Sequence, residues 1–342
     1  MKKLVVNSEN PYEITITRDL KIDEYIKTKY GKSKILVITD ENLAYIYSEY
    51  KNIPHYIINA GESSKDIEVY YKIIKFLSKN NFHRDSILLA FGGGVVGDIT
   101  GFVASTYLRG IPFVQVPTSL LSMVDSSVGG KTGINTEYGK NLIGSFYNPR
   151  EVLIDTRYLD TLPEEEFANG LAEVIKTAMI GDRSLVEALM TDQLEDGIEN
   201  IVEKSLKVKI DIVQKDMRES NLRRILNFGH TIGHGIEKLS DYKIKHGEGV
   251  AIGMAMISKA FHKKGLTPKD TLDILVALLE KYSLAKSFEV DKDSLFKAIL
   301  IDKKTEENYI NLVYLENIGM AKIYKAGLDE LKDILQIAID GN

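Results

Sequence analysis

Hydrophobic and polar positions change their spacing near the middle of the chain. In the first half, Tyr12–Thr17 alternates with a period of two, and strand-like runs recur at 34–39, 55–59, 86–91, 113–116 and 152–155. Continuous apolar runs are typical of strands buried on both faces of a parallel sheet. Helical segments separate them, one at about 66–79. This order predicts an open, mostly parallel sheet with helices on both faces.

The second half has helical spacing almost throughout. Pro163 opens a helix that extends to Gly181, with acidic residues in its first turn, where they suit the helix dipole. Further helices are expected at roughly 184–191, 197–216, 230–240, 246–264, 269–281 and 328–338, with short strands at 311–315 and 321–324. We therefore expect an α/β N-terminal domain at 1–158 and an α-helical C-terminal domain at 159–342.

Composition agrees with two globular domains and disfavours several classes. The chain has 342 residues and a mass of 38.4 kDa, which is long for a single hydrophobic core. Its net charge of -5 gives no electrostatic reason to expect nucleic acid or a membrane as a partner. No apolar run has the length of a signal peptide or a membrane span. The lack of cysteine excludes disulfides and cysteine-ligated metals, and we expect a cytoplasmic protein.

Three of the six histidines fall between positions 230 and 246. His230 and His234 are four residues apart and would share one face of a helix, while His246 begins the next apolar run. Imidazoles converging from two helices suit zinc, with a carboxylate as third ligand because the chain has no cysteine. The spacing is not the His-Glu-x-x-His pattern, so ordinary histidines remain an alternative.

Glu173 offers that carboxylate. It stands three residues before Lys176 on the helix opened by Pro163, so the two side chains share a face. They form either a surface ion pair, worth under about 1 kcal/mol, or a site in which Glu173 is the oxygen ligand.

Glycines at positions 92, 94 and 97 satisfy G-x-G-x-x-G between a predicted strand and a helical run from Ile99. Backbone NH groups and the positive end of a helix can hold a pyrophosphate there. The motif follows a late strand, and no acidic residue lies about twenty positions on. A phosphate-binding loop is therefore favoured over a standard dinucleotide-binding domain, with a glycine turn that binds nothing as the alternative.

A second glycine-rich loop covers 120–149. It carries Asp125, Lys131 and Lys140 among small residues and resembles an anion cradle. It is not a P-loop, because an upstream glycine is missing at the required spacing. Each lysine alone could equally be a solvated surface charge.

Together these motifs resemble the 3-dehydroquinate synthase family. The resemblance extends from Asp40 to Lys304, and its motifs stand in the same order at 92–98, 117–135, 170–177, 226–234 and 246–249. In that family a nucleotide-binding α/β domain precedes a helical domain, and zinc and substrate lie in a cleft. One departure is Ser119, where the family more often has threonine; its hydroxyl can still form hydrogen bonds.

The resemblance implies a role for each matching residue. Glu173, His230 and His246 would hold zinc, which Co²⁺ could replace, and His234 would relay a proton. The implied catalytic residues are His234, Lys176, Lys131, Asp125 and Glu219. The implied substrate contacts are Arg109, Asp125, Lys131, Lys176, Lys209, Arg223, Asn227 and one of Lys303 and Lys304. The implied NAD contacts are Asp40, Asn42, Gly61, Glu62, Lys65, Gly93, Gly94, Val95, Val96, Gly97, Asp98, Thr118, Ser119, Lys131, Lys140, Tyr158, Leu159, Asp160 and Thr161.

The implied reaction converts 3-deoxy-D-arabino-heptulosonate 7-phosphate into 3-dehydroquinate and phosphate. It would proceed by transient oxidation with NAD, phosphate elimination, re-reduction and an intramolecular aldol step. A homodimer is also implied, in which Arg109 could reach the neighbouring active site. The alternatives are a cyclase that makes 2-deoxy-scyllo-inosose or a valiolone-type product, a metal-dependent polyol dehydrogenase that releases NADH, and a non-catalytic homologue. Arg223 and Lys209 favour a carboxylated substrate, and every presumed catalytic position is filled.

Overall fold

The computed structural model describes residues 1–46, 53–191, 194–219, 221–302 and 308–340. The chain forms two compact units, Met1–Leu162 and Pro163–Asn342. The domain limits expected from the sequence, 1–158 and 159–342, stay a proposal beside this division. Lys303 and Lys304, of which one is an expected substrate contact, lie outside the described residues.

Unit 1 is built on a seven-stranded sheet. Its strands are β1 (Lys2–Val6), β2 (Tyr12–Thr17), β3 (Ile35–Asp40), β4 (His55–Ile58), β5 (Ile87–Gly92), β6 (Phe113–Pro117) and β9 (Glu151–Asp155). The order across the sheet is β1-β2-β9-β6-β5-β3-β4. The β1–β2 pair is antiparallel and the other pairs are parallel, which confirms the expected mostly parallel sheet.

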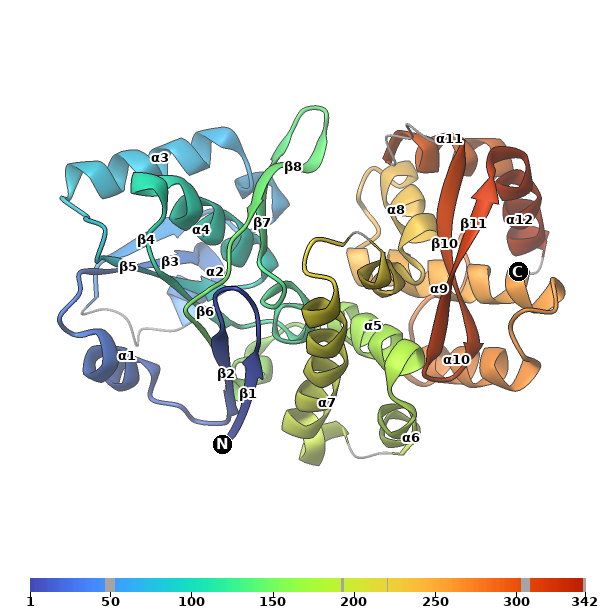
Figure 1. Cartoon of the computed structure of the whole chain (residues 1–342), viewed down its shortest axis with the longest axis horizontal. Coiled ribbons are helices and arrows are strands. Elements are labelled where there is room, and N and C mark those ends of the chain that lie inside the picture. Colours follow the sequence, from blue (N-terminus) through green and yellow to red (C-terminus); the bar gives the residue numbers. More distant parts are fainter. Residues whose placement is uncertain (47–52, 192–193, 220, 303–307, 341–342) are drawn as a thin grey trace. The chain divides into compact units, whose positions relative to one another are not determined.

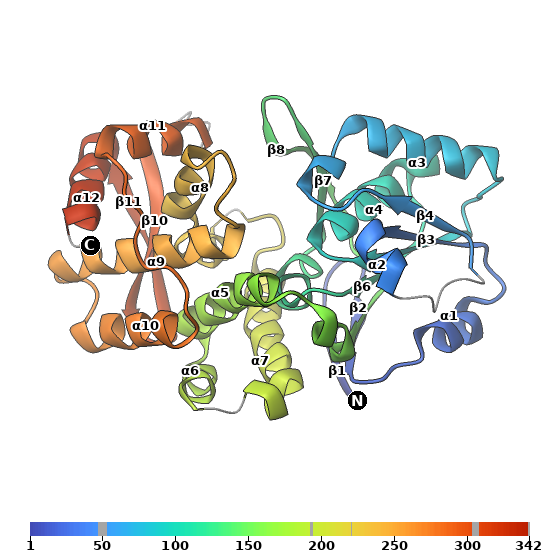
Figure 2. The ribbon, with the colours of Figure 1, turned by 180° about the vertical axis from the view of Figure 1, so that it is seen from behind.

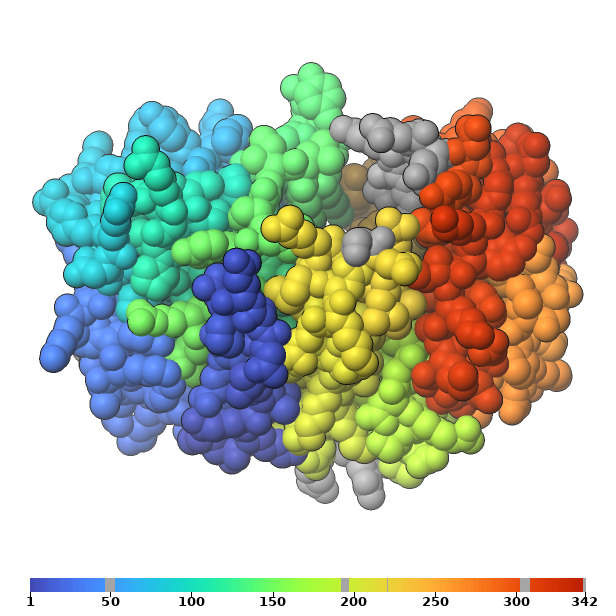
Figure 3. Space-filling model, viewed as in Figure 1, coloured from blue at the N-terminus to red at the C-terminus, as the bar shows by residue number. Residues whose placement is uncertain are grey.

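Burial explains which strands could be predicted. Strands β5, β6 and β9 are buried at every residue, as their continuous apolar runs require. Strand β1 was not predicted, and it stands at the edge of the sheet with Lys3 and Val5 exposed. Figure 3 shows the N-terminal strand pair, in dark blue, at the surface of unit 1.

Helices cover both faces of the sheet (Figure 1). Helices α3 (Ile67–Lys79) and α4 (Gly94–Thr106) pack on one side in a core with β3 and β5. Helix α1 (Ile22–Tyr30) lies on the other side, and the short α2 (Glu41–Ile46) follows β3. The parallel strands therefore end at one common edge, where loops can hold a ligand.

The glycines of segment 120–149 suggested one irregular loop, but the segment has regular structure. It contains the short π-helical turn η3 (Ser122–Ser126) and an antiparallel hairpin of β7 (Lys131–Thr136) and β8 (Gly139–Phe146). Two glycines, Gly133 and Gly144, face each other across this hairpin. A Cβ on Gly144 would lie 2.4 Å from Thr132 O, so the close pairing depends on glycine there.

Unit 2 is mainly helical. It contains α5 (Glu164–Gly181), α6 (Arg183–Met190), α7 (Leu194–Lys215), α8 (His230–Leu239), α9 (His246–Lys263), α10 (Lys269–Lys281), α11 (Lys292–Asp302), β10 (Tyr309–Asn317), β11 (Met320–Gly327) and α12 (Leu328–Asp340). Helix α9 contacts α5, α8, α10 and α12 and is buried along most of its length, so it forms the centre of this unit (Figure 2). The expected helical C-terminal domain is confirmed. Within the described part of the chain, no helix combines the length and apolar character needed to cross a bilayer.

Candidate functional site

Helix α5 carries an acid and a base in its buried interior. Glu173 and Lys176 are 0% and 1% exposed, so they are not a surface ion pair. Lys176 Nζ forms an ion pair with Glu173 Oε2. Neither carboxylate oxygen accepts a hydrogen bond from the described residues, however. Because a buried carboxylate needs compensation, Glu173 is suited to receive a second cation.

Close packing of α8 against α9 brings the histidines together. Gly229 precedes α8 with a φ of 80°, a left-handed conformation that a side chain would strain. A Cβ on Gly253 of α9 would lie only 2.0 Å from Gly229 O. The two helices can therefore approach each other only because both positions are glycine, and this approach places His230 and His234 beside His246.

The distances within this cluster fit a metal centre. Glu173 Oε1 lies 3.7 Å from His230 Nε2 and 3.7 Å from His246 Nε2. The candidate ligand nitrogens of His230, His234 and His246 lie within 4.8 Å of one another. Zinc bonds of about 2.0–2.2 Å in a tetrahedron separate neighbouring ligand atoms by about 3.3–3.6 Å. The two distances from Glu173 are already close to this spacing, so these residues fit around a divalent cation.

The second ring nitrogens of His230 and His246 each have a partner. His230 Nδ1 lies 3.2 Å from Phe228 O, and His246 Nδ1 lies 2.9 Å from Glu237 Oε1. Because each partner is an acceptor, Nδ1 carries the proton in the neutral ring and Nε2 keeps its lone pair for a metal. Glu237 was not predicted from the sequence. Its position could have indicated a role, because residues three after His234 and seven after His230 share a helix face with them.

Two ligand sets are geometrically available. One consists of the three histidines, and the other of Glu173 with His230 and His246. The set with Glu173 fits better, because its buried Oε1 accepts no hydrogen bond from the described part of the chain and is equally distant from both Nε2 atoms. In that set His234 is not a ligand, and its ring lies beside those of His230 and His246.

The surroundings keep His230 neutral. Burial lowers the pKa of His230 well below its usual value, and positive charge on Lys176, His246 and His234 lowers it further. A neutral imidazole is the form that binds a metal, so this electrostatic environment favours a ligand role.

Two more cations are buried in unit 2. Lys209 in α7 is 5% exposed, and Arg223 in η5 (Leu222–Asn227) is 3% exposed. Arg223 donates from Nη1 to Met217 O at 2.7 Å, and its backbone NH donates to Asp216 Oδ2 at 3.0 Å. Helices α5 and α7 and the turn η5 contact one another. Each of these elements carries one buried cation: Lys176 on α5, Lys209 on α7 and Arg223 on η5. Since charged side chains are seldom buried, these cations indicate a site for an anionic ligand.

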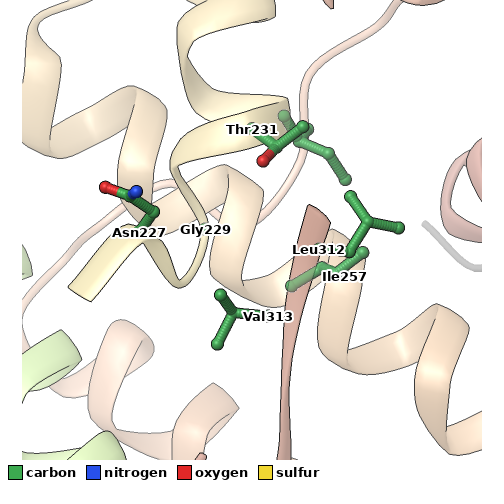
Figure 4. A pocket seen from close by; sticks show the side chains of 7 residues that line it. Asn227, Gly229, Thr231, Ile257, Leu312 and Val313 are labelled. Carbon is green, nitrogen blue, oxygen red and sulfur yellow. The ribbon is translucent and has the colours of Figure 1, made fainter. Parts of the chain in front are cut away.

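Asn227 lies at the end of η5 and donates from Nδ2 to Glu219 Oε1 at 2.8 Å. Glu219 has a φ of 58°, and such backbone strain is often found at functional sites. Asn227 also lines a cavity of about 10 Å³ with Thr231 and Leu312 among others (Figure 4). That volume holds about one water molecule, so this cavity is not the site of a larger substrate.

In unit 1 the glycine motif forms the junction between β5 and α4. Helix α4 begins at Gly94 rather than at Ile99, so the NH groups of the motif belong to the first helical turn. A Cβ on Gly92 would lie 2.5 Å from Val96 Cγ2, and Val96 itself is buried. The motif therefore presents backbone at a helix N-terminus, as an anion site requires.

Lys65 connects three segments near this junction. Its Nζ lies 2.7 Å from Asp98 Oδ2 in α4 and 2.6 Å from Asn141 Oδ1 in β8. Glu62, in η1 (Glu62–Ser64), accepts from Asn135 Nδ2 at 2.8 Å. Burial raises the pKa of Asp98, while the charge of Lys65 opposes the rise. Asn135 and Asn141 were not predicted as site residues, since an amide in a glycine-rich segment has no distinctive signal.

The other expected NAD contacts follow the ends of strands. Asp40 ends β3 and accepts from Leu43 N at 3.1 Å, and burial raises the pKa of its carboxyl group. Thr118 and Ser119 follow β6, and η4 (Thr156–Thr161), which contains Tyr158, Leu159, Asp160 and Thr161, follows β9. Asn42 lies in α2, and Gly61 precedes η1 with a φ of 97°. This arrangement matches the ligand-binding edge of an open parallel sheet.

The side chains of the remaining expected residues vary in exposure. Arg109, in η2 (Tyr107–Arg109), is exposed and has a φ of 67°. Lys131 and Lys140 are exposed on the β7–β8 hairpin, and Asp125 is half-buried in η3. Their roles, and those of the other expected site residues, stay predictions.

Fold and site together define a class: a metal-dependent enzyme with a phosphate-binding α/β unit and buried cations. Family models described as 3-dehydroquinate synthase N-terminal and 3-dehydroquinate synthase C-terminal match residues 55–169 and 170–305. The 3-dehydroquinate synthase of Clostridium perfringens is 44% identical over 347 residues, covering 96% of this chain and 99% of that protein. The 3-dehydroquinate synthase of Streptococcus suis (strain 05ZYH33) is 40% identical over 357 residues, covering 98% and 100%. The chain belongs to the 3-dehydroquinate synthase family, which confirms the resemblance.

Solved structures agree on the fold. A 2-epi-5-epi-valiolone synthase from Streptomyces hygroscopicus, with NAD⁺ and Zn²⁺ bound, matches with a TM-score of 0.86 at 25% identity, covering 98% of this chain and 99% of that one. A 2-deoxy-scyllo-inosose synthase complexed with carbaglucose-6-phosphate, NAD⁺ and Co²⁺ matches with a TM-score of 0.84 at 23% identity and the same coverage. An iron-containing alcohol dehydrogenase matches with a TM-score of 0.64 at 15% identity, covering 98% and 99%.

Proposed function

We propose that this chain converts 3-deoxy-D-arabino-heptulosonate 7-phosphate into 3-dehydroquinate and phosphate. The observation that carries the proposal is the centre of buried Glu173 with partly buried His230 and His246, in which Glu173 Oε1 lies 3.7 Å from the Nε2 atom of each histidine, in a member of this family. The buried cations Lys209 and Arg223 support it, because the substrate carries a carboxylate and a phosphate.

Glu173, His230 and His246 would hold zinc, or Co²⁺ in its place. The phosphate loop at 93–98 would hold the pyrophosphate of NAD, and the residues at the strand ends of unit 1 would complete the cofactor site. When bound, NAD accepts and returns a hydride, while zinc polarises substrate oxygens and lowers the pKa of the reacting alcohol. This chemistry leaves no net oxidation.

The protein groups would bind the substrate and move its protons. His234, beside the ligand cluster, would accept the proton of the reacting hydroxyl. Lys176, Lys209 and Arg223 would neutralise and orient the substrate's anionic groups, which favours departure of phosphate. Asp125, Lys131 and Glu219 are the other proposed catalytic residues, and Arg109 and Asn227 are further proposed substrate contacts.

Sequence identity decides against the alternatives. The named synthases match at 40–44% identity, whereas the valiolone and inosose synthases match at 25% and 23%. The alcohol dehydrogenase is more distant still, at 15%. We also propose that the protein is a homodimer and that it is cytoplasmic. Light scattering of the purified protein would test the dimer.

The decisive experiment supplies the heptulosonate phosphate with zinc and a catalytic amount of NAD. We expect many turnovers of phosphate release for each NAD, 3-dehydroquinate as the product, and no lasting absorbance at 340 nm. Accumulation of NADH in proportion to substrate consumed would establish the dehydrogenase instead.

A further inference from the structure

Glu237 is a buried carboxylate that the catalytic cycle described above does not use. It lies on the face of α8 that carries His230 and His234, and only 4% of its surface is exposed. Its Oε1 accepts the Nδ1 proton of His246 at 2.9 Å. A Cβ on Gly249 would lie 3.1 Å from Glu237 Cγ, so glycine there leaves room for this carboxylate. A buried carboxylate is costly without such a partner.

His246 needs a partner to fix its ring. It is the first residue of α9, and its side chain is 31% exposed. The preceding residue, Lys245, pairs with Glu165 at 2.7 Å and with Glu166 at 2.9 Å, so those two carboxylates are engaged with the lysine. The ring of His246 is instead held from α8, by Glu237.

We propose that Glu237 is a positioning residue for the metal centre. By accepting the Nδ1 proton, its carboxylate selects the tautomer of His246 in which Nε2 is unprotonated and faces Glu173, 3.7 Å away. A carboxylate bound to the second nitrogen also raises the basicity of a metal-binding imidazole. The inference rests on the proposed metal centre, and it gives His246 and His230 different supports, since His230 is held by a carbonyl.

The first test compares Glu237→Gln with the wild-type protein. Glutamine has nearly the same shape but no charge, so the chain should fold with little change. We expect its Zn²⁺ affinity, measured by competition with a chromophoric chelator, to fall by about 10–100-fold. The spectrum of bound Co²⁺ should also change, because the His246 ligand is altered. Glu165→Gln, which removes the exposed carboxylate that pairs with Lys245, should keep the wild-type affinity. Wild-type affinity and spectrum in folded Glu237→Gln would overturn the proposal.

A second measurement does not depend on any Glu237 variant folding. In zinc-loaded wild-type protein, ¹⁵N NMR of the histidine rings should show His246 protonated at Nδ1 and metal-bound at Nε2, with the signal assigned by its loss in His246→Ala. Metal at Nδ1, or a proton at Nε2, would overturn the proposal. Neither measurement uses substrate or NAD. A chain that binds zinc as described but releases no phosphate would therefore contradict the proposed function alone.

Discussion

Lys176 forms its ion pair with Glu173 from one helical turn away, and both side chains are almost completely buried. The ammonium therefore balances the charge of the carboxylate in the metal-free protein. We expect Lys176→Met to lower the free energy of unfolding by about 3–5 kcal/mol, because it leaves the Glu173 charge buried alone. Zinc should recover part of this loss, since the metal brings positive charge to the same carboxylate. Urea unfolding with and without zinc measures both effects.

The matched control is Lys215→Met. Lys215 Nζ pairs with Asp211 at 2.7 Å on the surface of α7, and an exposed helical pair contributes well under 1 kcal/mol, about 0.3–0.5 kcal/mol. Equal losses of unfolding free energy in the two variants would show that burial does not increase the contribution of the Lys176–Glu173 pair.

A pH dependence is expected from Tyr30 in α1. Burial, and then its hydrogen bond to Glu151 Oε1, raises the pKa of Tyr30 above its usual value of about 10. Above that pH the unfolded chain loses the tyrosine proton while the folded chain keeps it. The contribution of protonated Tyr30 to the free energy of unfolding is therefore complete below about pH 10. It is lost as the pH rises, by up to about 1.4 kcal/mol per pH unit. Urea unfolding between pH 8 and pH 11 measures this slope.

Tyr30→Phe should reduce that slope and also destabilise the protein at neutral pH, because Glu151 loses a donor. Tyr45→Phe, at a tyrosine that is 93% exposed, should leave the slope unchanged. The same slope in Tyr30→Phe as in the wild type would exclude Tyr30 as its origin.

The fold was predictable where burial decides the pattern. The apolar runs of β5, β6 and β9 and the helices of unit 2 other than α11 were found from the sequence. The β7–β8 hairpin was not, because Gly133 and Gly144 interrupt the alternation and β8 is mostly exposed. Helix α1 was not predicted either, because its nine residues mix charged side chains with tyrosines and carry only two isoleucines.

The clustering of the three histidines with Glu173 was predictable for another reason. Three histidines close in sequence are rare, and Glu173 was the carboxylate that could join them. Glu237 could not be singled out, because acidic residues are common on helix surfaces and only the folded chain shows that this one is buried against His246. Spacing identifies residues on a shared helix face, but the partner across two helices depends on tertiary packing.

Arg223→Lys should impair recognition of the substrate's carboxylate. Lysine keeps the charge but loses the planar fork that binds a carboxylate through two parallel hydrogen bonds. We expect KM for the heptulosonate phosphate to rise at least about tenfold, since a hydrogen bond to a charged group contributes about 1.5–3 kcal/mol. The Kd for NAD should stay nearly constant. Steady-state kinetics and NAD titration measure the two, with Arg224→Lys as the neighbouring control; parallel losses for substrate and NAD would argue against a substrate contact.

The three histidines of the centre should separate into ligands and a proton carrier. His230→Ala and His246→Ala each remove an imidazole whose Nε2 lies 3.7 Å from Glu173 Oε1, so bound zinc and turnover should fall together. His234→Ala should keep near-normal zinc while turnover drops by about 10²–10⁴-fold, the usual contribution of a general acid–base group. Metal analysis of the purified variants decides the assignment. His262→Ala is the control, since His262 lies near the other end of α9 with its Nδ1 2.9 Å from Thr267 O. Loss of zinc in His234→Ala with retention in His246→Ala would contradict both ligand sets, since each contains His246, and the metal ligands and the proton carrier would have to be reassigned.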